Sequence, residues 1–241
     1  MLKLIFADFY KVFHRTYFYV LTLVLAALAV FVVVSLHTGS PQADTVSVAL
    51  QLALQYLVMP VMVLPCLTDI VLNEEYREHT AKNTMAYGTN RVMLYSAKLI
   101  TAFLLGVLMM AVVLGLYFAA SMVLLQHDTA LTGALLGEFF IRIAASCVVY
   151  AACLGMAAFF STLCSRNTLW LFLFYGAFLF SDLLLKLLRL DGGTAYLLKT
   201  QILSVSGNPV NQLLRPVLIS LATLVLFYVA GTVLFCKKDM S

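Results

Sequence analysis

Charged side chains are scarce in this sequence. Only 11% of its 241 residues are charged and 63% are hydrophobic, whereas a soluble domain normally carries about 25% charged residues. So few charges cannot cover the surface of a water-soluble globule of this size. The mean hydropathy of +1.00 also favours lipid as the surrounding solvent. The formal net charge of +4 is too small and too scattered to predict a nucleic-acid partner.

Motifs of enzymatic chemistry are missing as well. The sequence contains neither a G-x-x-x-x-G-K-[ST] phosphate loop nor a G-x-S-x-G nucleophile motif. Its five cysteines lie in apolar runs or at their ends without a C-x-x-C pair, which favours a packing role. His79 and His127 fall in loops expected on opposite sides of a membrane, where they cannot share a metal ion. We therefore expect no catalytic residue, no metal site and no cofactor bound by this chain.

Six apolar runs are long enough to cross a membrane, because a helix needs about 20 residues to span the hydrocarbon. Pro60 and Pro65 lie inside the second run and predict kinks there. The sequence thus predicts an all-α integral membrane protein, with a single transmembrane domain over residues 1–241. The runs cover residues 17–36, 48–72, 98–125, 139–163, 168–188 and 217–236.

The positions of Lys and Arg predict the orientation. The N-terminal segment, the second and fourth loops and the C-terminal segment carry these residues, whereas the first loop (37–47) and the third loop (126–138) carry none. Because cytoplasmic loops are enriched in Lys and Arg, we expect a multi-pass protein of the cell membrane with both termini in the cytoplasm. The fifth loop (186–215) is the exception, because it is placed outside but carries four of these cations.

Two segments outside the runs have apolar patterns of their own. Residues 1–15 place apolar side chains at helical spacing, including Phe6 and Phe9, with Lys3, Asp8, Lys11 and Arg15 mostly between them. This pattern is typical of a helix on the membrane surface, and the alternative is a cytoplasmic extension of the first span. In the fifth loop, residues 195–205 are apolar but too short to cross, which favours an interfacial or re-entrant helix.

The remaining ionisable residues of the apolar runs are expected near the membrane interfaces. Asp182 lies toward the outer end of the fifth run, close in sequence to Lys186 and Arg189, and we interpret these three residues as a possible outer gate. Glu138 and Arg142 are four residues apart and are able to pair. Because no chain of acidic residues crosses the midplane, a translocation route lined by apolar side chains is favoured over a proton-driven carrier.

The second loop, residues 73–91, is polar and has helix signals at both ends. Asn73 is able to cap a short helix, Gly88 to end it, and Asn90 to cap the next span. A connector between neighbouring spans needs only two to about eight residues. A charged helix in its place suggests a docking surface for a cytoplasmic partner.

This loop resembles the permease subunits of ABC-2 type transporters, with one departure at His79, where that family usually has Gly. The residues that carry the resemblance are Glu75, Tyr76, Thr80, Lys82, Asn83, Gly88, Arg91, Tyr95 and Lys98. The resemblance implies that residues 73–91 form a coupling helix in a groove of a separate ABC ATPase. It also implies that residues 1–15 form an elbow helix on the same ATPase, and that residues 189–215 form a helical cap on the outer side.

The resemblance further implies a pair of permease subunits, a homodimer or a heterodimer with a paralogue, and ATP with Mg²⁺ bound only by the partner ATPase. We expect export of a hydrophobic or amphipathic substrate, namely a peptide antibiotic, a lantibiotic or a lipid, as in antibiotic resistance or self-immunity. The alternative is a non-transporting membrane sensor or scaffold whose cytoplasmic loop docks a regulator. Residues expected at the ATPase are Glu75, Tyr76, Thr80, Lys82, Asn83 and Arg91 in the loop and Phe6, Phe9, Lys11 and Arg15 in the elbow helix.

Overall fold

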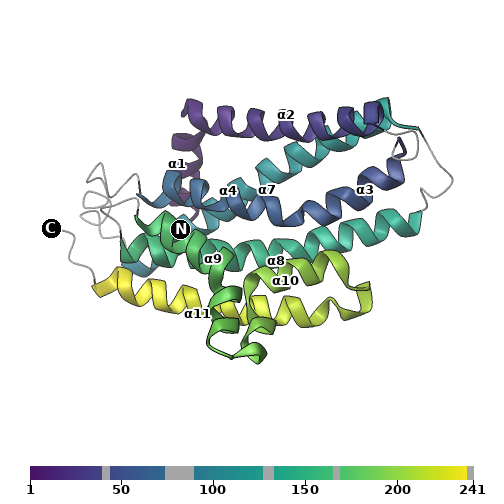
Figure 1. Cartoon of the computed structure of the whole chain (residues 1–241). Coiled ribbons are helices and arrows are strands. Elements are labelled where there is room, and N and C mark those ends of the chain that lie inside the picture. Colours follow the sequence, from purple (N-terminus) through teal and green to yellow (C-terminus); the bar gives the residue numbers. More distant parts are fainter. Residues whose placement is uncertain (40–43, 74–89, 127–132, 165–168, 238–241) are drawn as a thin grey trace.

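The computed structural model describes residues 1–39, 44–73, 90–126, 133–164 and 169–237, and these form an elongated bundle of helices (Figure 1). Within this part of the chain, six helices are long and apolar enough to cross a membrane, which confirms the predicted number of spans. The elements are α1 (Leu2–Phe13), α2 (Thr16–Gly39), α3 (Val46–Gln55), η1 (Tyr56–Val58), α4 (Met59–Thr68), η2 (Asp69–Asn73), α7 (Arg91–Leu124), α8 (Gly133–Leu163), α9 (Leu169–Leu187), η3 (Asp191–Tyr196), α10 (Leu198–Gly207), η4 (Val210–Gln212) and α11 (Leu214–Lys237).

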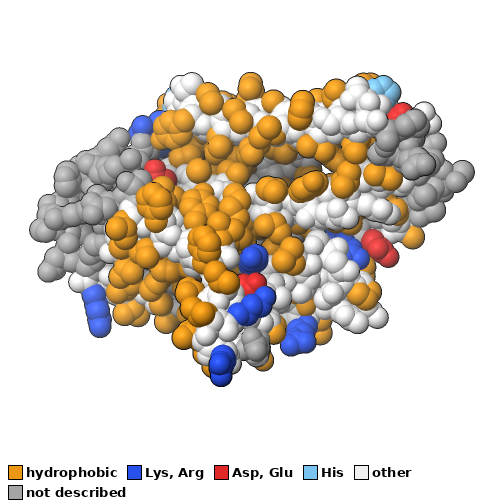
Figure 2. Space-filling model, viewed as in Figure 1, with side chains coloured by type: hydrophobic (Ala, Val, Ile, Leu, Met, Phe, Trp, Pro, Cys, Tyr) orange, Lys and Arg blue, Asp and Glu red, His pale blue; other side chains and the backbone are white. Residues whose placement is uncertain are grey.

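The fourth span, α8, is the central helix of the bundle. It packs most extensively against α11 and also contacts α4, α7, α9 and α10. In its most apolar stretch 61% of the residues are buried, against 11% for α2. Small side chains such as Ala152, Ala157 and Gly155 allow close approach; a Cβ at Gly155 would lie 3.3 Å from Leu224 of α11. The other spans therefore expose large apolar faces, as expected of a surface in contact with lipid (Figure 2).

The second span is a broken helix. It consists of α3, a 3-10 turn (η1), α4 and a π-helical turn (η2). Pro60 lies in the first turn of α4, where a backbone N–H is not needed, and the 3-10 turn lies just before it. Pro65 lies inside α4, as predicted.

Tyrosine hydroxyls from three other spans bind carbonyl oxygens of this broken span. Tyr117 of α7 donates to Ala49, Tyr150 of α8 donates to Leu57, and Tyr175 of α9 donates to Met62, each at 2.7 Å. Leu57 lies in the 3-10 turn η1, and in hydrocarbon no water is present to bind a carbonyl group that irregular backbone leaves free, so a neighbouring side chain must do so. The Tyr150 hydroxyl thus stabilises the 3-10 turn. The Tyr117 and Tyr175 hydroxyls bind carbonyls inside α3 and α4 and help to fix the span between α7, α8 and α9.

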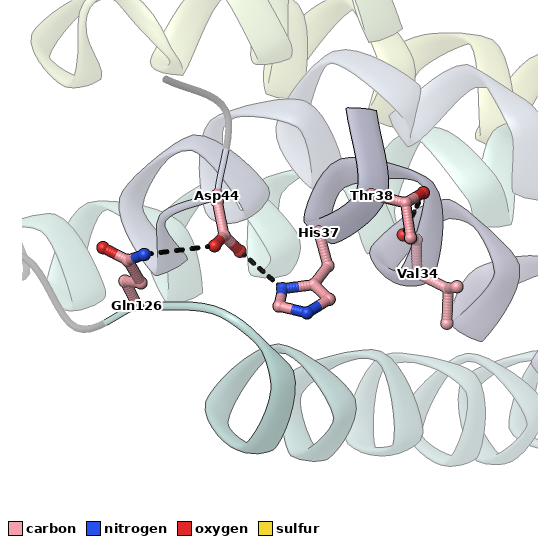
Figure 3. A network of polar contacts seen from close by, with 5 residues as sticks. All are labelled: Val34, His37, Thr38, Asp44 and Gln126. Atoms are coloured by element: carbon pink, nitrogen blue, oxygen red, sulfur yellow. Dashed lines mark hydrogen bonds and ion pairs between the residues drawn. The ribbon is translucent and has the colours of Figure 1, made fainter. Parts of the chain in front are cut away.

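A polar network joins the first three spans at the end of the bundle remote from α1 (Figure 3). His37 at the end of α2 lies 3.0 Å from Asp44, and the Gln126 amide donates to the same carboxylate at 3.3 Å. Backbone hydrogen bonds also join Asp44 and Val46 to Gln126, beyond the end of α7. Below the network, Val33 of α2 is fully buried in a cluster with Val46 and Tyr117. One end of α2 is therefore fixed against α3 and α7.

The segment between α9 and α11 turns back along the bundle. The apolar side of α10 is buried against α8, α3 and η1, and Ile202 and Val205 are fully covered. The helix begins at Leu198, three residues later than the predicted apolar piece, because residues Asp191–Tyr196 form the 3-10 helix η3. Hydrogen bonds from Thr200 to Thr194 and from Gln201 to Ala195 hold η3 against α10.

The helices α7 and α11 are tightly packed where Tyr95 meets Gly231. Tyr95 of α7 is fully buried, and a Cβ at Gly231 of α11 would overlap its hydroxyl. We expect Gly231→Ala to lower the free energy of unfolding by about 1–3 kcal/mol, the usual range for overpacking. Thermal unfolding of the purified protein in detergent measures the effect.

The matched control is Gly176→Ala in α9, where nothing lies within 4 Å of the added Cβ. This change should be neutral or stabilising, because Ala is a better helix former than Gly. Equal melting temperatures for the two variants would contradict the close contact.

Candidate functional site

One end of the bundle gathers segments from distant parts of the sequence. The helix α1 packs against α7 and η2, and the start of α7 meets the end of α11. These elements flank the predicted coupling segment, since η2 ends at Asn73 and α7 begins at Arg91. We therefore take this end, formed by α1, η2, the first two turns of α7 and the last turn of α11, as the candidate functional site.

The predicted docking residues of the second loop lie on both sides of the boundary of the described residues. Glu75, Tyr76, Thr80, Lys82 and Asn83 lie outside the described residues, so their role stays a prediction. The predicted cap of the following span is confirmed: the side chain of Asn90 accepts a hydrogen bond of 3.1 Å from the N–H of Val92.

Arg91 makes a contact within the chain that the sequence did not reveal. Its guanidinium donates to the carbonyl oxygen of Cys236 at 2.7 Å. Cys236 lies in the last turn of α11, where carbonyl groups lack helical partners and carry partial negative charge. Arg91 therefore joins the beginning of the third span to the end of the sixth span.

A buried ion pair connects α1 to α7. Lys98 Nζ lies 2.7 Å from Asp8 Oδ1, and each side chain is only 7% exposed. The amphipathic pattern assigned Asp8 to the polar surface of α1, and this was wrong: the carboxylate points into the bundle. The pattern failed because its partner lies 90 residues away in sequence.

The predicted elbow residues lie on different sides of α1. Phe9 is partly buried against the core and stacks on Phe13, with ring centroids 5.8 Å apart. Phe6 is 71% exposed, and Lys11 is also exposed. Arg15 lies at the corner between α1 and α2, which a hydrogen bond from Tyr19 to the carbonyl of Phe13 stabilises.

The exposed side of α1 carries an apolar row as well as the exposed Lys3 and Lys11. Leu2, Phe6 and Tyr10 follow one another at four-residue intervals, and each is at least 67% exposed. The stripe predicted from the sequence is therefore divided, because some of its apolar residues face the core and others face outward. An outward apolar row suits a helix that lies at the membrane interface.

The three residues of the predicted outer gate lie around the end of α9. Lys186 is 3.4 Å from Asp182, one helical turn away, and both side chains are partly or largely exposed. Arg189 ends the helix in the left-handed conformation, with φ of 57°. Hydrogen bonds from Leu190 to Leu185 and from Arg189 to Lys186 complete a Schellman motif, in which Gly normally takes the position of Arg189.

Arg142 was expected to pair with Glu138, and the closest approach of the two side chains is 3.9 Å. Its shorter contacts are to α10: the guanidinium donates to the carbonyl oxygens of Val205 and Ser206 at 2.9 and 3.0 Å. A buried cation thus binds the C-terminal carbonyls of α10, where the helix dipole favours positive charge. This residue holds α10 against α8.

The Asp8–Lys98 pair gives a test of how α1 is attached. Removing one partner leaves the other charge buried, so Asp8→Leu and Lys98→Met should each lower the free energy of unfolding by about 3–5 kcal/mol. The double variant should lose much less than the sum, because neither charge remains. Denaturant unfolding in detergent measures all three.

The exposed pair Asp182–Lys186 is the matched control, since both residues are also on helices. The corresponding changes there should cost less than about 1 kcal/mol. Strictly additive effects of the Asp8 and Lys98 changes would contradict a coupled buried pair.

The backbone of Arg189 gives a second test. A residue with a Cβ pays about 1–2 kcal/mol for the left-handed conformation. We therefore expect Arg189→Gly to raise the melting temperature, with a gain in the free energy of unfolding of up to about 1 kcal/mol after the greater freedom of unfolded Gly is subtracted. Arg189→Ala removes the same side chain but keeps the Cβ, so it should not stabilise. Stabilisation by both changes would assign the effect to the loss of charge instead.

Comparison with known proteins identifies the family. The model of the ABC-2 family transporter protein matches residues 4–178 of the chain, from α1 to the middle of α9. No curated protein matches the sequence. Members of this family are membrane permeases that lack ATPase activity and generally pair with ABC ATPase subunits. The chain therefore belongs to the ABC-2 transporter family and is the membrane permease component of such a transporter.

Proposed function

We propose that this permease serves an ATP-driven exporter of hydrophobic or amphipathic molecules, such as a peptide antibiotic, a lantibiotic or a lipid. The observation that carries the proposal is the convergence of α1, η2, the start of α7 and the end of α11 at one end of the bundle. ATP-driven closure of two ABC ATPase subunits would act on this end. Antibiotic resistance or self-immunity is the biological setting that the proposal favours.

The orientation that this mechanism requires places the candidate functional site in the cytoplasm. The Lys and Arg residues of the N-terminal and C-terminal segments support it, because the first and third loops lack them. In this orientation residues 1–15 act as the elbow helix, residues 73–91 as the coupling helix and residues 189–215 as a cap on the outer side. The position of α10, folded back against α8, supports a re-entrant cap.

Two hydrogen-bonded links would transmit movement of the coupling segment into the spans. Asp8–Lys98 joins the third span to α1, and Arg91 joins it to the end of α11. Displacement of the start of α7 would therefore move three elements together. The broken second span is attached to the same segment through η2 and gives the bundle a place to bend.

The pair Asp182–Lys186, with Arg189, would form the outer gate of a permease dimer. Its support is the large apolar surface around it on α9, which includes Phe180, Leu183 and Leu187. Each of these side chains is more than half exposed in the single chain. A second permease, either an identical copy or a paralogue, would cover such a surface.

Co-purification tests the docking proposal. The tagged chain, extracted from its own cells in mild detergent, should retain ABC ATPase subunits that mass spectrometry identifies. Charge reversals Glu75→Lys and Lys82→Glu should remove most of the ATPase, because they invert the charges offered to its groove. ATP hydrolysis by the purified complex should fall in parallel.

Lys199→Glu in α10 is the control, since it reverses a charge remote from the coupling segment. It should leave the amount of bound ATPase unchanged. Recovery of equal ATPase with all three variants would refute docking through residues 73–91.

A further inference from the structure

A cavity of about 570 Å³ lies between the first span and the broken second span. Its walls come from α2, α3, η1, α4, α7 and α8, and it is hollowed into the face shown in Figure 2, between α2 and the α3–α4 segment. This volume is within the range of about 300–1,000 Å³ that is typical of ligand sites. We propose that it binds the acyl chain of a membrane lipid.

The two fixed ends of α2 keep this cavity open. Near one end, Phe18 is buried and its ring packs edge-on against Phe13 of α1. Near the other end, Val33 is fully buried and His37 contacts Asp44. Between them α2 packs along α7, and its residues Leu25, Leu28 and Val32 line the cavity.

The walls of the cavity consist almost entirely of apolar side chains. None of the residues that line the cavity carries a charge. Three tyrosines line the cavity. The hydroxyls of Tyr117 and Tyr150 donate to the carbonyls of Ala49 and Leu57, and the third tyrosine is Tyr56, which is 51% exposed. A peptide would bring amide groups that find no partner here, and burial of an unpaired amide costs several kcal/mol. Water is also disfavoured, since apolar cavities of this kind stay dry.

An acyl chain satisfies all of these conditions. It has no hydrogen-bonding group along its length, and it surrounds the spans of any membrane protein. The cavity is open to the exposed apolar surface of the spans, so a chain can enter from the bilayer. Met59, Met62 and Met110 line it with flexible side chains that adapt to an irregular occupant. This inference depends on the membrane location alone and not on the cargo proposed above.

Fluorescence quenching in vesicles tests the proposal. Trp170 is the single tryptophan, so Trp170→Phe gives a background in which Phe103→Trp reports from the cavity wall. The protein is reconstituted into phosphatidylcholine vesicles whose acyl chains either carry bromine or do not. We expect brominated chains to remove most of the emission of Phe103→Trp.

A second change separates the cavity from the bulk lipid. Ala29→Phe fills the cavity from α2 and should restore most of the lost emission, whereas Ala27→Phe on the exposed side of the same helix should not. Phe172 is 78% exposed, so the emission of Phe172→Trp should be quenched by brominated lipid in every variant. This quenching shows that the protein is inserted in the bilayer. Ala53 lines the cavity from α3, so Ala53→Phe fills it from the opposite wall and serves as the test variant if Ala29→Phe does not insert into the vesicles.

Two results would overturn the proposal. The first is unchanged emission of Phe103→Trp in brominated vesicles that do quench Phe172→Trp. The second is quenching of Phe103→Trp that persists equally after Ala29→Phe or Ala53→Phe. Because the vesicles hold lipid and no peptide, quenching that the cavity-filling changes relieve assigns the site to a lipid chain. Loss of ATPase docking leaves this readout unaffected, so the two proposals fail separately.

Discussion

The lack of water inside a membrane governs the second span of this protein. A helix that breaks in hydrocarbon leaves carbonyl groups that only other parts of the protein can bind. Here the Tyr150 hydroxyl binds the carbonyl of Leu57 in the 3-10 turn, and hydroxyls of Tyr117 and Tyr175 bind carbonyls inside α3 and α4, each at 2.7 Å. The irregular span is therefore held in one position without becoming a regular helix. These contacts, together with the small side chains of α8, help to hold α7, α8 and α9 around it.

The same rule explains why the charged contacts lie where they do. Lys98 and Arg142 are buried cations, and each has a partner of negative or partly negative charge: a carboxylate of α1 for Lys98 and the end of α10 for Arg142. Both contacts attach a peripheral helix to a central span. Buried charges are therefore used here to attach helices, and the proposed lipid cavity lies in the uncharged region between α2 and the second span.

The sequence predicted the architecture well and the contacts poorly. Hydropathy is a local property, so the six apolar runs could be located without knowledge of their neighbours, and the N-cap at Asn90 followed from its position before an apolar run. Asp8 was misassigned for the opposite reason: local spacing marked it as a surface residue, but a lysine far along the chain compensates its burial. Pro60 was expected to disturb the second span, and a 3-10 turn lies immediately before the helix α4 that contains it.

The amino-acid sequence by itself determined that this is a helical membrane protein of six spans, with a polar loop that resembles the ABC-2 permeases. Composition and the length of apolar runs are enough for that, because a bilayer accepts few structures other than long apolar helices. Only the tertiary structure decided which spans meet. The Asp8–Lys98 link, the bond from Arg91 to α11, the tyrosine contacts and the cavity beside α2 all join residues that are distant in sequence. No periodicity encodes such pairs, because they arise only when helices pack in three dimensions.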